Sequence, residues 1–541
     1  MNTAERIIER WGKLRGERSN FEGQWQEIAE YTRPLRNEFV AQRSPGEKRA
    51  QKVFDSTPLG AVDNFAGGIY GMMTNPANRW FSLAIEDDDL NEYDPVRDWL
   101  YEVESRLLRS FGPQISRFYS VIPAIYADLA CFGTAVFYSE EEEGKRRIND
   151  SARSLSECCI VENAQGEVDT VYRRYTMQAR NALKAFDGNV SEGTKKKAEK
   201  DPFCPVWFIH CVEPNGDYEP KKIGPDGMAF SSIYVEEEAK REVSRSGYQE
   251  LPYQVPRWSQ ASGETYGRGL GELAIADVKT LNRMSETSLR AAQKAADPPL
   301  AAPDEGVIKV ARTYPGGISY GAVDAQGRLL LQAIHSGADH GLTLELMEQR
   351  RNAIREAFYF SLMQMIGSPD MTATEWLGRQ EEKLRLMGPN LGRIQSEFLS
   401  PLIKRRFGIL LRAGQLPPAP QEIQGAGLNV EYVSPLARAQ MAGEANAVVR
   451  LYSSVMPIAQ LEPSVMDNLD HDEAVQAMAK GFAVPAKVLR GSAERDQARE
   501  QRAQMQQAAA MVQGAQGVAK AAKDGASAVK TVADAQQGQA A

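Results

Sequence analysis

One long helical segment, bounded by glycines and prolines, constrains this chain more than any other feature. It follows the glycine-rich stretch Gly263–Gly269 and ends before Pro298 and Pro299. Glycine permits the tight turn that opens a helix, and proline ends one because it has no amide donor and disfavours the α region for the residue before it. The pattern predicts a helix from Gly271 to Ala296, about 39 Å long at the α-helical rise. The chain must therefore accommodate one long rod.

Four basic residues share one side of this predicted helix. At roughly 100° per residue their spacing places them within a sector of about 60°; they are Lys279, Arg283, Arg290 and Lys294. The opposite side carries alanines and the larger apolar residues Leu273, Val278, Leu281, Met284 and Leu289, which must pack on neighbours. A solvated face with ordinary ion pairing is the alternative interpretation, because Glu286 can pair with Arg290. From this helix alone, a functional basic stripe and a solvated face both stay open.

A small β segment and a second helix follow the prolines. Short apolar runs around a Tyr314–Gly317 turn predict strands, at Val307–Val310, Ile318–Tyr320 and Leu329–Gln332. A second helix is predicted from Gly341 to Ile366, with an apolar face made of Leu344, Met347, Ile354, Phe358, Leu362 and Met365. If the two helices are antiparallel, the β insert is held at the far end of a stalk.

The residues before the stalk predict a mixed α+β body. We expect a helical run from Thr3 that Pro34 stops, a helix from Ser56 to Asn75, a strand at Trp80–Ile85, helices beginning at Asp94 and Pro123, and a strand at Gly133–Tyr138. Residues Cys159 to Val243 read mainly as strands and loops, most clearly at Val168–Tyr172 and Val206–His210, with Lys195–Lys197 in a solvated loop.

The residues after the stalk are predominantly helical. The expected elements are helices over 374–386 and 390–411, a strand at Val430–Val433, and helical pieces from Arg438 to Arg490 divided by Pro457, Pro463 and Pro485. From Glu494 to Ala541 the chain is rich in Ala and Gln and has few bulky apolar residues. We expect partial helix to about Val512 and disorder beyond it.

A series of short motifs, in order along the chain, resembles the head-to-tail connecting, or portal, proteins of short-tailed bacteriophages. The motifs are Arg18-Phe21-Trp25-Ile28-Tyr31-Pro34, Phe54–Thr57, Asn75-Pro76, Trp80-Phe81, Arg257-Trp258, Tyr266–Gly269, Pro298-Pro299, Met371–Glu375, Leu386–Pro389, Phe398–Leu402 and Gly414–Pro417. Each is weak alone, and the resemblance covers most of the chain.

The resemblance implies an α+β portal-type fold. By it, residues 1–260 are an α/β wing, 261–297 the first stem helix, 298–340 a small β-containing clip and 341–366 the second stem helix. Ser368, Pro369, Asp370, Met371 and Thr372 belong to the tunnel-loop region, residues 367–375, where the side chains of Met371 and Thr372 are expected to brush DNA without holding it. The basic residues of the first stem helix, Lys279, Arg283, Arg290 and Lys294, are expected to face either the DNA passage or the acidic residues of an adjacent subunit, and the sequence does not choose between the two. Residues 376–437 return to the wing as helices and a strand, and 438–541 form a helical crown with an Ala/Gln-rich, partly disordered tail.

The resemblance also implies the function and the partners. The chain is expected to form a dodecameric ring at one capsid vertex of the virion, assembled in the host cytoplasm, through which double-stranded DNA passes during packaging and ejection. A heterologous interface closes into a ring when its rotation divides the circle. The implied partners are the terminase large subunit, a tail adaptor, and the major capsid and scaffolding proteins.

Composition is compatible with this function. At 541 residues, 42% of them hydrophobic, the chain can bury a sizeable core of several domains. No apolar run is long enough to span a bilayer and no secretory signal is recognisable at the start, so no membrane partner is expected. The cysteines Cys131, Cys158, Cys159, Cys204 and Cys211 are odd in number and match no disulfide framework, which suits a reducing cytoplasm.

The net charge of -8 bears on how the chain would meet DNA. Tight DNA binders release counterions with clustered Lys and Arg. A conduit needs few, weak and repeated contacts instead, because each firmly held phosphate would stop the duplex. The acidic balance therefore disfavours a tight, sequence-specific binder.

Enzymatic motifs are missing from the sequence. There is no P-loop, and the glycines of Gly267–Gly271 are better explained by backbone freedom before a helix. Asp87–Asp89 reads as a solvated acidic loop. Cys204, Cys211 and His210 do not match the spacing of structural zinc sites. We predict no catalysis, no metal and no cofactor. Two alternatives to a ring subunit remain open at this point: a packaging enzyme or nuclease, and a monomeric DNA-binding or packaging accessory protein.

Overall fold

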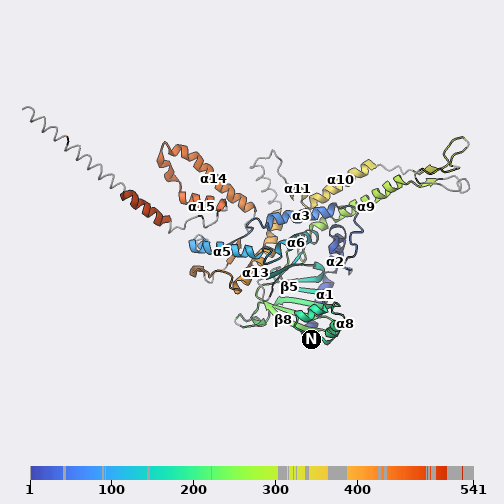
Figure 1. The fold of residues 1–541 in the computed structure, drawn as a ribbon, viewed down its shortest axis with the longest axis horizontal. Coiled ribbons are helices and arrows are strands. Elements are labelled where there is room, and N and C mark those ends of the chain that lie inside the picture. The colour runs from blue at the N-terminus through green and yellow to red at the C-terminus, as the bar shows by residue number, and fades with distance from the viewer. Residues whose placement is uncertain are drawn as a thin grey trace, which may run out of the picture. The chain divides into compact units, whose positions relative to one another are not determined.

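The computed structural model describes residues 2–40, 44, 46–87, 90–91, 93–142, 147–220, 222–301, 314, 316–320, 322–324, 326–334, 340–363, 387–423, 428–431, 435–482, 484, 488, 495–508 and 527. They form a mixed helix and sheet structure (Figure 1), which confirms the broad α+β prediction. The chain divides into two compact units. Unit 1 comprises Met1–Ser82, Glu104–Leu416 and Val430–Ala439, and unit 2 comprises Leu83–Val103, Pro417–Asn429 and Gln440–Ala541.

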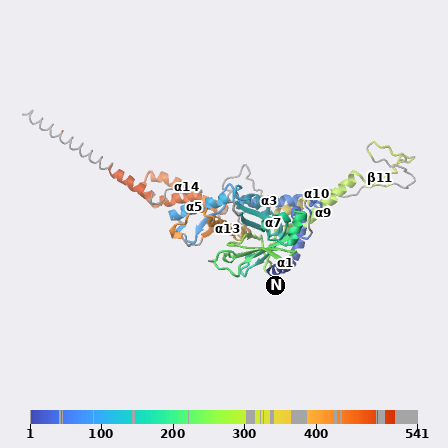
Figure 2. The same ribbon diagram turned by 60° about the horizontal axis from the view of Figure 1, so that its bottom comes forward.

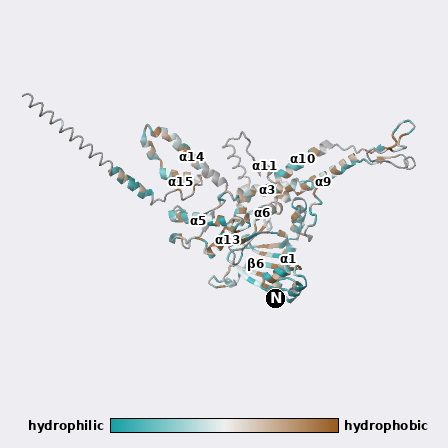
Figure 3. Cartoon of the chain, in the orientation of Figure 1, coloured by the Kyte–Doolittle hydropathy of each residue, from teal (hydrophilic) through white to brown (hydrophobic). Residues whose placement is uncertain are grey.

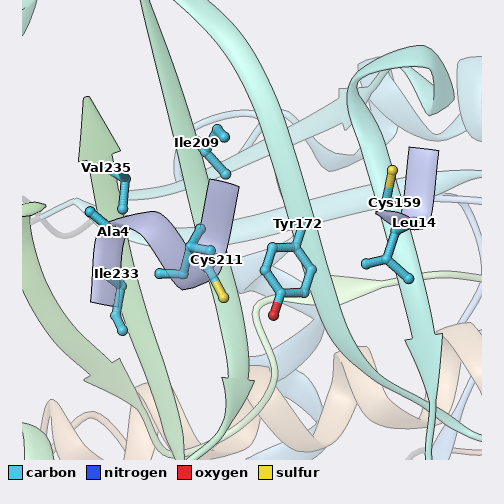
Figure 4. Packing of buried hydrophobic residues seen from close by; sticks show 9 residues of the cluster. Ala4, Leu14, Cys159, Tyr172, Ile209, Cys211, Ile233 and Val235 are labelled. Carbon is cyan, nitrogen blue, oxygen red and sulfur yellow. The ribbon is translucent and has the colours of Figure 1, made fainter. Parts of the chain in front are cut away.

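A five-stranded antiparallel sheet forms one core of unit 1, in the order β4-β5-β6-β7-β8. Its strands are Cys158–Glu162, Val168–Gln178, Pro205–Pro214, Phe230–Glu236 and Arg241–Tyr248. Alternate side chains point to opposite faces of a strand. Ile209 and Cys211 of β6 pack under helix α1 (Thr3–Glu17), as Figure 4 shows. Val206 and Phe208 of β6 belong to a second buried cluster, in which they pack with two helices.

Those helices are α7 (Ala179–Ala185) and α8 (Glu192–Lys200). The prediction of a solvated loop at Lys195–Lys197 was wrong, because these lysines lie within α8. Ser191 caps the helix by accepting a hydrogen bond from the Thr194 amide, and Ala198 is buried against the sheet. A short helix with one buried alanine carries too weak an apolar pattern to be recognised in the sequence.

The predicted N-terminal helical run is interrupted. Helix α1 ends at Glu17 and α2 covers Ser19–Thr32, with the short helix η1 (Pro34–Arg36) after it. Arg18 at the break is buried and donates hydrogen bonds to the carbonyls of Leu155 and Ser156, at 2.9 and 2.7 Å, and to Glu22 at 2.8 Å. These bonds hold the chain at the turn between the helices, a tertiary effect that helical spacing cannot reveal.

A three-stranded sheet, in the order β3-β2-β9, lies between helices of unit 1 and the five-stranded sheet. Its strands are Arg147–Arg153, Val136–Glu142 and Tyr253–Gln254. On one face Phe137 meets Phe398 with ring centroids 5.4 Å apart, and on the other Tyr253 and His210 are hydrogen bonded. Helices α3 (Thr57–Met73) and α6 (Phe118–Phe132) also pack together in this unit. Helix α6 begins five residues before the predicted start and contains Pro123, because Phe118 and Ile122 are fully buried and hold its first turns.

The predicted long helix is present as α9, Leu270–Ala296, and it lies beside α10, His340–Ala357 (Figures 1 and 2). Between them β10 (Leu300–Ala301) pairs with β11 (Gln332–Ala333). The Gly317 amide donates to the Tyr314 carbonyl, which confirms the predicted turn. Ile318–Tyr320 is not a strand, contrary to prediction: Ile318 and Tyr320 are 62% and 79% exposed and no described strand lies beside them. Val307–Val310 lies outside the described residues.

The second long helix is shorter than predicted. Helix α10 stops at Ala357, and a separate turn, α11 (Phe360–Met363), follows it. Tyr359 lies in the left-handed region at φ 54°, which ends the helical ladder. Phe358 is fully buried, and the ring of Tyr359 packs near that of Trp258, with the two ring centroids 6.4 Å apart. Aromatic packing therefore bends the chain where the sequence predicted one continuous helix to Ile366.

Helical residues 387–394, the π-helical turn η4 (Gln395–Leu399) and α13 (Ser400–Arg412) return to the three-stranded sheet. Arg406 of α13 and Asp150 of β3 form an ion pair in which both side chains are fully buried. Pro401 lies within the predicted helix 390–411 and occupies the first turn of α13, where its missing amide is tolerated. The helix predicted over 374–386 lies outside the part of the chain that the structure describes.

The remaining elements are mostly helical. They are η5 (Gln421–Ile423), β1 (Ser82–Ile85) paired with β12 (Leu428–Glu431), α5 (Asp94–Ser110), α14 (Pro435–Ala459), η6 (Pro463–Asn468) and α15 (His471–Gly481). Pro457 lies inside α14 instead of dividing it. Residues 495–508 form a predominantly hydrophilic helix (Figure 3), in agreement with the partial helix expected there.

Helix α9 begins in a close backbone contact with the end of α6. We call Gly133, Gly267, Gly269 and Gly271 the glycine junction. A Cβ atom at Gly269 would lie 2.5 Å from the Gly133 nitrogen, and one at Gly271 would lie 2.5 Å from the Cys131 carbonyl oxygen. Only Gly133 has a positive φ, at 70°. Gly267, Gly269 and Gly271 are therefore required for close approach, and the expected backbone freedom is not their role, whereas Gly263, at φ 82°, does use that freedom.

We predict that Gly269→Ala destabilises the chain by about 1–3 kcal/mol, because the added methyl group would displace packed backbone. Gly23→Ala is the matched control. Gly23 lies within α2, where a Cβ meets nothing within 4 Å, so the substitution should stabilise by about 0.5–1 kcal/mol through helix propensity. Urea unfolding of both variants measures the difference. Equal effects of the two substitutions would contradict the junction.

Candidate nucleic-acid interface

The basic stripe of α9 divides into two parts in the structure. Lys279 is bound to Glu27 of α2 at 2.5 Å, and this hydrogen bond raises the pKa of Lys279. Arg283 and Arg290 share one carboxylate, Glu286, at 3.1 and 2.6 Å. Their side chains are 79% and 70% exposed, and Lys294 is exposed with no ion pair among the described residues. Ion pairing thus occurs, but Arg283 and Arg290 share one carboxylate and Lys294 has none among the described residues.

The opposite side of α9 is only partly buried within the chain. Val278 and Leu281 are buried as predicted, whereas Leu273 and Leu289 are 75% and 52% exposed. On α10, Met347, Ile354 and Phe358 are buried, but Leu344 is 60% exposed. The apolar faces of the two helices are therefore only partly covered within the single chain, and their packing on neighbours stays a prediction.

Residues 52–57 fasten the helix pair to the body of unit 1. Asn282 of α9 is buried; its Oδ1 accepts a hydrogen bond from the Phe54 amide and its Nδ2 donates to the Lys52 carbonyl, both at 2.7 Å. Asp55 accepts from Arg351 of α10 at 2.9 and 3.1 Å and from Ser285 of α9 at 3.4 Å. Asp55 therefore contacts both helices.

Sequence reasoning missed these positioning residues. Asn282 was detectable in principle, because it is a polar residue within the sector of α9 that holds Val278 and Leu281. Asp55 belongs to the motif Phe54–Thr57, but its partner Arg351 lies 296 residues away and no local pattern connects them.

The charge of Asp55 is stabilised where it lies. Burial raises its pKa, but the hydrogen bonds from Thr57 and the interaction with Arg351 outweigh burial, and the net shift of the pKa is downward. The carboxylate therefore stays ionised at neutral pH and keeps its contact with α10.

Arg257 joins three further segments. Its side chain is buried and donates to Glu397 at 2.9 and 3.1 Å, to the Gly166 carbonyl at 2.8 Å, and to Glu162. The neighbouring Trp258 packs edge-on against Phe65 of α3 at 5.3 Å. The helical residues 387–412 that return to the three-stranded sheet are called the return helix below. The motif Arg257-Trp258 thus connects the chain before α9 to the return helix and to α3.

The histidine and the cysteines that the sequence offered as candidate metal ligands are described in the structure. His210 is buried, stacks on Tyr234 at 4.0 Å, and is hydrogen bonded to Tyr253 and Ser232 at 2.8 and 3.0 Å; burial lowers its pKa. The five cysteines are free thiols. Among the described residues no three His, Cys, Asp or Glu side chains are grouped to hold a metal ion, and no helix is long and apolar enough to cross a membrane.

The predicted tunnel-loop residues Ser368, Pro369, Asp370, Met371 and Thr372 lie outside the described residues, as do Asp88 and Asp89. The structure therefore brings together only the α9 part of the predicted site.

We predict that Asp55→Asn lowers the free energy of unfolding at pH 7 and that its difference from the wild type shrinks as the pH falls below about 4, the ordinary value of an aspartate. The folded pKa is depressed, so the stabilisation is present above the unfolded pKa and is lost as the pH falls through the folded one. Chemical unfolding of both proteins between pH 7 and pH 2 measures the difference in the free energy of unfolding.

The control for this prediction is Asp63→Asn, on an exposed position of α3. This variant should differ little from the wild type at every pH. A deficit of Asp55→Asn that stays constant down to pH 2 would show that the charge of Asp55 has no role.

Comparison with known proteins agrees with the motifs. The family model described as bacteriophage head to tail connecting protein matches residues 4–489. The chain is 32% identical over 505 residues to a probable portal protein of Bordetella phage BPP-1, covering 92% of this chain and 90% of that protein. It is 28% identical over 509 residues to the portal protein of Salmonella phage epsilon15, covering 92% and 91%.

Solved structures give a weaker similarity. A chain from the virion of a native gene transfer agent particle matches with a TM-score of 0.34 and 12% identity, over 79% of this chain and 95% of that one. A score of this size does not establish a shared fold. The family match extends over nearly the whole sequence, and on that ground the chain belongs to the bacteriophage head-to-tail connecting proteins.

Proposed function

We propose that this connector is the portal subunit of a phage particle: a ring, dodecameric by family likeness, at one capsid vertex, through which double-stranded DNA enters during packaging and leaves during ejection. The observation that carries the proposal is the family match over residues 4–489, supported by similarity to phage proteins named as portals along nine-tenths of the chain.

The long helix pair has a place in such a ring. Residues 1–260 are then the wing, α9 and α10 the stem, 298–340 the clip, 367–375 the tunnel-loop region and 438–541 the crown. The contacts of Asp55, Asn282 and Arg257 support this assignment, because they would hold the stem at a fixed angle to the wing in every subunit.

Exposed apolar residues on the stem support ring closure. Leu273, Leu289 and Leu344 are more than half exposed in the single chain, and burying such side chains against a neighbour is favourable by about 1.5–3 kcal/mol each. A heterologous interface of this kind closes into a ring when its rotation divides the circle.

Arg283, Arg290 and Lys294 are the candidates to face DNA. Their charge exceeds that of Glu286, and their exposure leaves them free to touch passing phosphates. Lys279 is less suited because Glu27 holds it. Surface contacts of this type are individually weak, about 0–1 kcal/mol, as a conduit requires. The terminase large subunit, a tail adaptor, and capsid and scaffolding proteins are the partners that the family likeness adds.

We predict that the double reversal Arg283→Glu and Arg290→Glu reduces the yield of DNA-filled particles several-fold while rings still form. The reason is that acidic side chains would repel the duplex along the passage. The measurement is complementation of a phage lacking its own copy of this gene, with encapsidated DNA quantified and the purified rings counted by negative-stain microscopy.

The control for packaging is Lys196→Glu and Lys200→Glu, the same change of charge on exposed positions of α8. It should package normally. Loss of rings in the α9 variant would assign the two arginines to the subunit interface, and normal packaging with intact rings would contradict their contact with DNA.

A further inference from the structure

A groove of about 650 Å³ opens in unit 1 beside the three-stranded sheet. Its floor is the strand around Tyr253–Val255. One wall is the turn between β4 and β5 with the first residues of β5, and it carries Glu167 and Asp169. The other wall is α13, with Lys404. No part of the proposed DNA passage or of the stem lines it.

The floor of the groove is an edge strand with unused backbone groups. Strand β9 pairs with β2 through Gln254 opposite Phe137, and the flanking amides of Ser139 and Ala135 donate to the carbonyls of Pro252 and Pro256. In an antiparallel pair alternate residues face the partner strand. Tyr253 and Val255 therefore direct their backbone amides and carbonyls away from β2, toward the groove.

The next outward-facing amide, that of Arg257, has a hydrogen-bond acceptor. The amide of Arg257 donates to the Glu397 carboxylate at 3.0 Å. For Tyr253 and Val255 no hydrogen-bonding partner of the outward backbone groups exists among the described residues, although the two residues are only 1% and 4% exposed. Buried backbone groups are almost always paired, so this edge is a site at which a further strand can add.

A buried side chain in the groove also has an unused group. Gln254 is 2% exposed and lines the groove. Its Nε2 donates to the Leu251 carbonyl at 2.8 Å, while its Oε1 accepts no hydrogen bond from any residue that the structure describes. A buried acceptor of this kind is costly to leave unpaired. A molecule bound in the groove could donate a hydrogen bond to it.

The two walls differ in charge. Lys404 is exposed on the return helix and has no carboxylate within ion-pair distance in the described part of the chain, and neither Glu167 nor Asp169 has a cation there. The other charged residues nearby are paired: Arg257 and Arg393 face Glu162 and Glu397. Glu250, which also lines the groove, is paired with Arg405 and Arg412 of α13. One wall is therefore basic and the other acidic.

The walls lie on opposite faces of the sheet. Phe137 and Gln254 share the face covered by the return helix, and Tyr253 faces the five-stranded sheet. The side chains of a strand added at this edge would alternate between the two walls.

We propose that this groove binds an extended segment of a second protein, added as an antiparallel strand to the edge of Tyr253–Val255, with acidic side chains toward Lys404 and basic side chains toward Glu167 and Asp169. Main-chain hydrogen bonds supply the affinity of such strand addition, and the alternating side chains supply its specificity. The proposal does not depend on ring formation or on DNA, and it identifies a separate docking surface on the wing.

The test uses the purified full-length protein and three fluorescent peptides of about six residues, the usual length of a strand. The first alternates Glu and Lys, the second has the same composition in two blocks, and the third is the alternating peptide with N-methylated backbone amides. Fluorescence anisotropy gives the three Kd values.

The alternating peptide should bind about fivefold tighter than the block peptide, as expected for one or two favourable surface pairs, and about tenfold tighter than the N-methylated one, which cannot pair with the edge. Lys404→Glu should raise its Kd about fivefold. Lys196→Glu, the same change of charge on α8, should leave the Kd unchanged. A photoreactive group on the peptide should label residues of the groove.

Equal affinities for the three peptides, no measurable binding, or labelling elsewhere on the protein would each overturn the proposal. If the peptide binds the isolated subunit but is excluded from the assembled ring, a neighbouring copy fills the groove and the assignment to a second protein is wrong. None of these results depends on whether the particles package DNA, so failure here is distinguishable from failure of the portal function.

Discussion

The contact between the end of α6 and the start of α9 is made by backbone, and the position of the long helix depends on it. At the glycine junction the two backbone segments approach so closely that no side chain fits at Gly269 or Gly271. Hydrogen bonds from the Gly267 amide to Thr134 and from the Trp258 amide to Gly133, both 2.8 Å, fix the same contact. Because the contact involves main-chain atoms, it leaves little freedom in the direction of α9.

Two polar clusters extend this fixed point. Asn282 and Asp55 bind α9 and α10 to residues 52–57, and Arg257 binds the segment before α9 to the return helix. Buried polar contacts of this kind are costly to break once one partner is removed. The helix pair is thus held as far as the middle of α9, and Arg283, Arg290 and Leu289 in its second half are exposed. A subunit built in this way presents the same rod at the same angle each time, which is what a repeating assembly requires.

Local sequence patterns predicted the elements that depend on local chemistry. The bounds of α9 agree with prediction to one residue, because glycines and prolines mark both ends, and the strands at Val168 and Val206 follow from their β-branched and aromatic residues. The errors occurred where tertiary contacts override periodicity. Arg18 breaks the first helical run by binding distant carbonyls, and Tyr359 ends α10 beside Trp258. The basic stripe was visible in the sequence, but its division between Lys279 and the distal arginines depends on Glu27, which lies in another helix.

A rigidly held helix pair with exposed apolar residues should gather with other copies around an axis as a closed ring. Native mass spectrometry of the purified wild-type chain, with negative-stain images of the same sample, shows whether it does. We expect one discrete mass at a multiple of the subunit, about twelve by family likeness, and images of rings with a central hole. A stable single subunit at micromolar concentration, with no rings in the images, would contradict it.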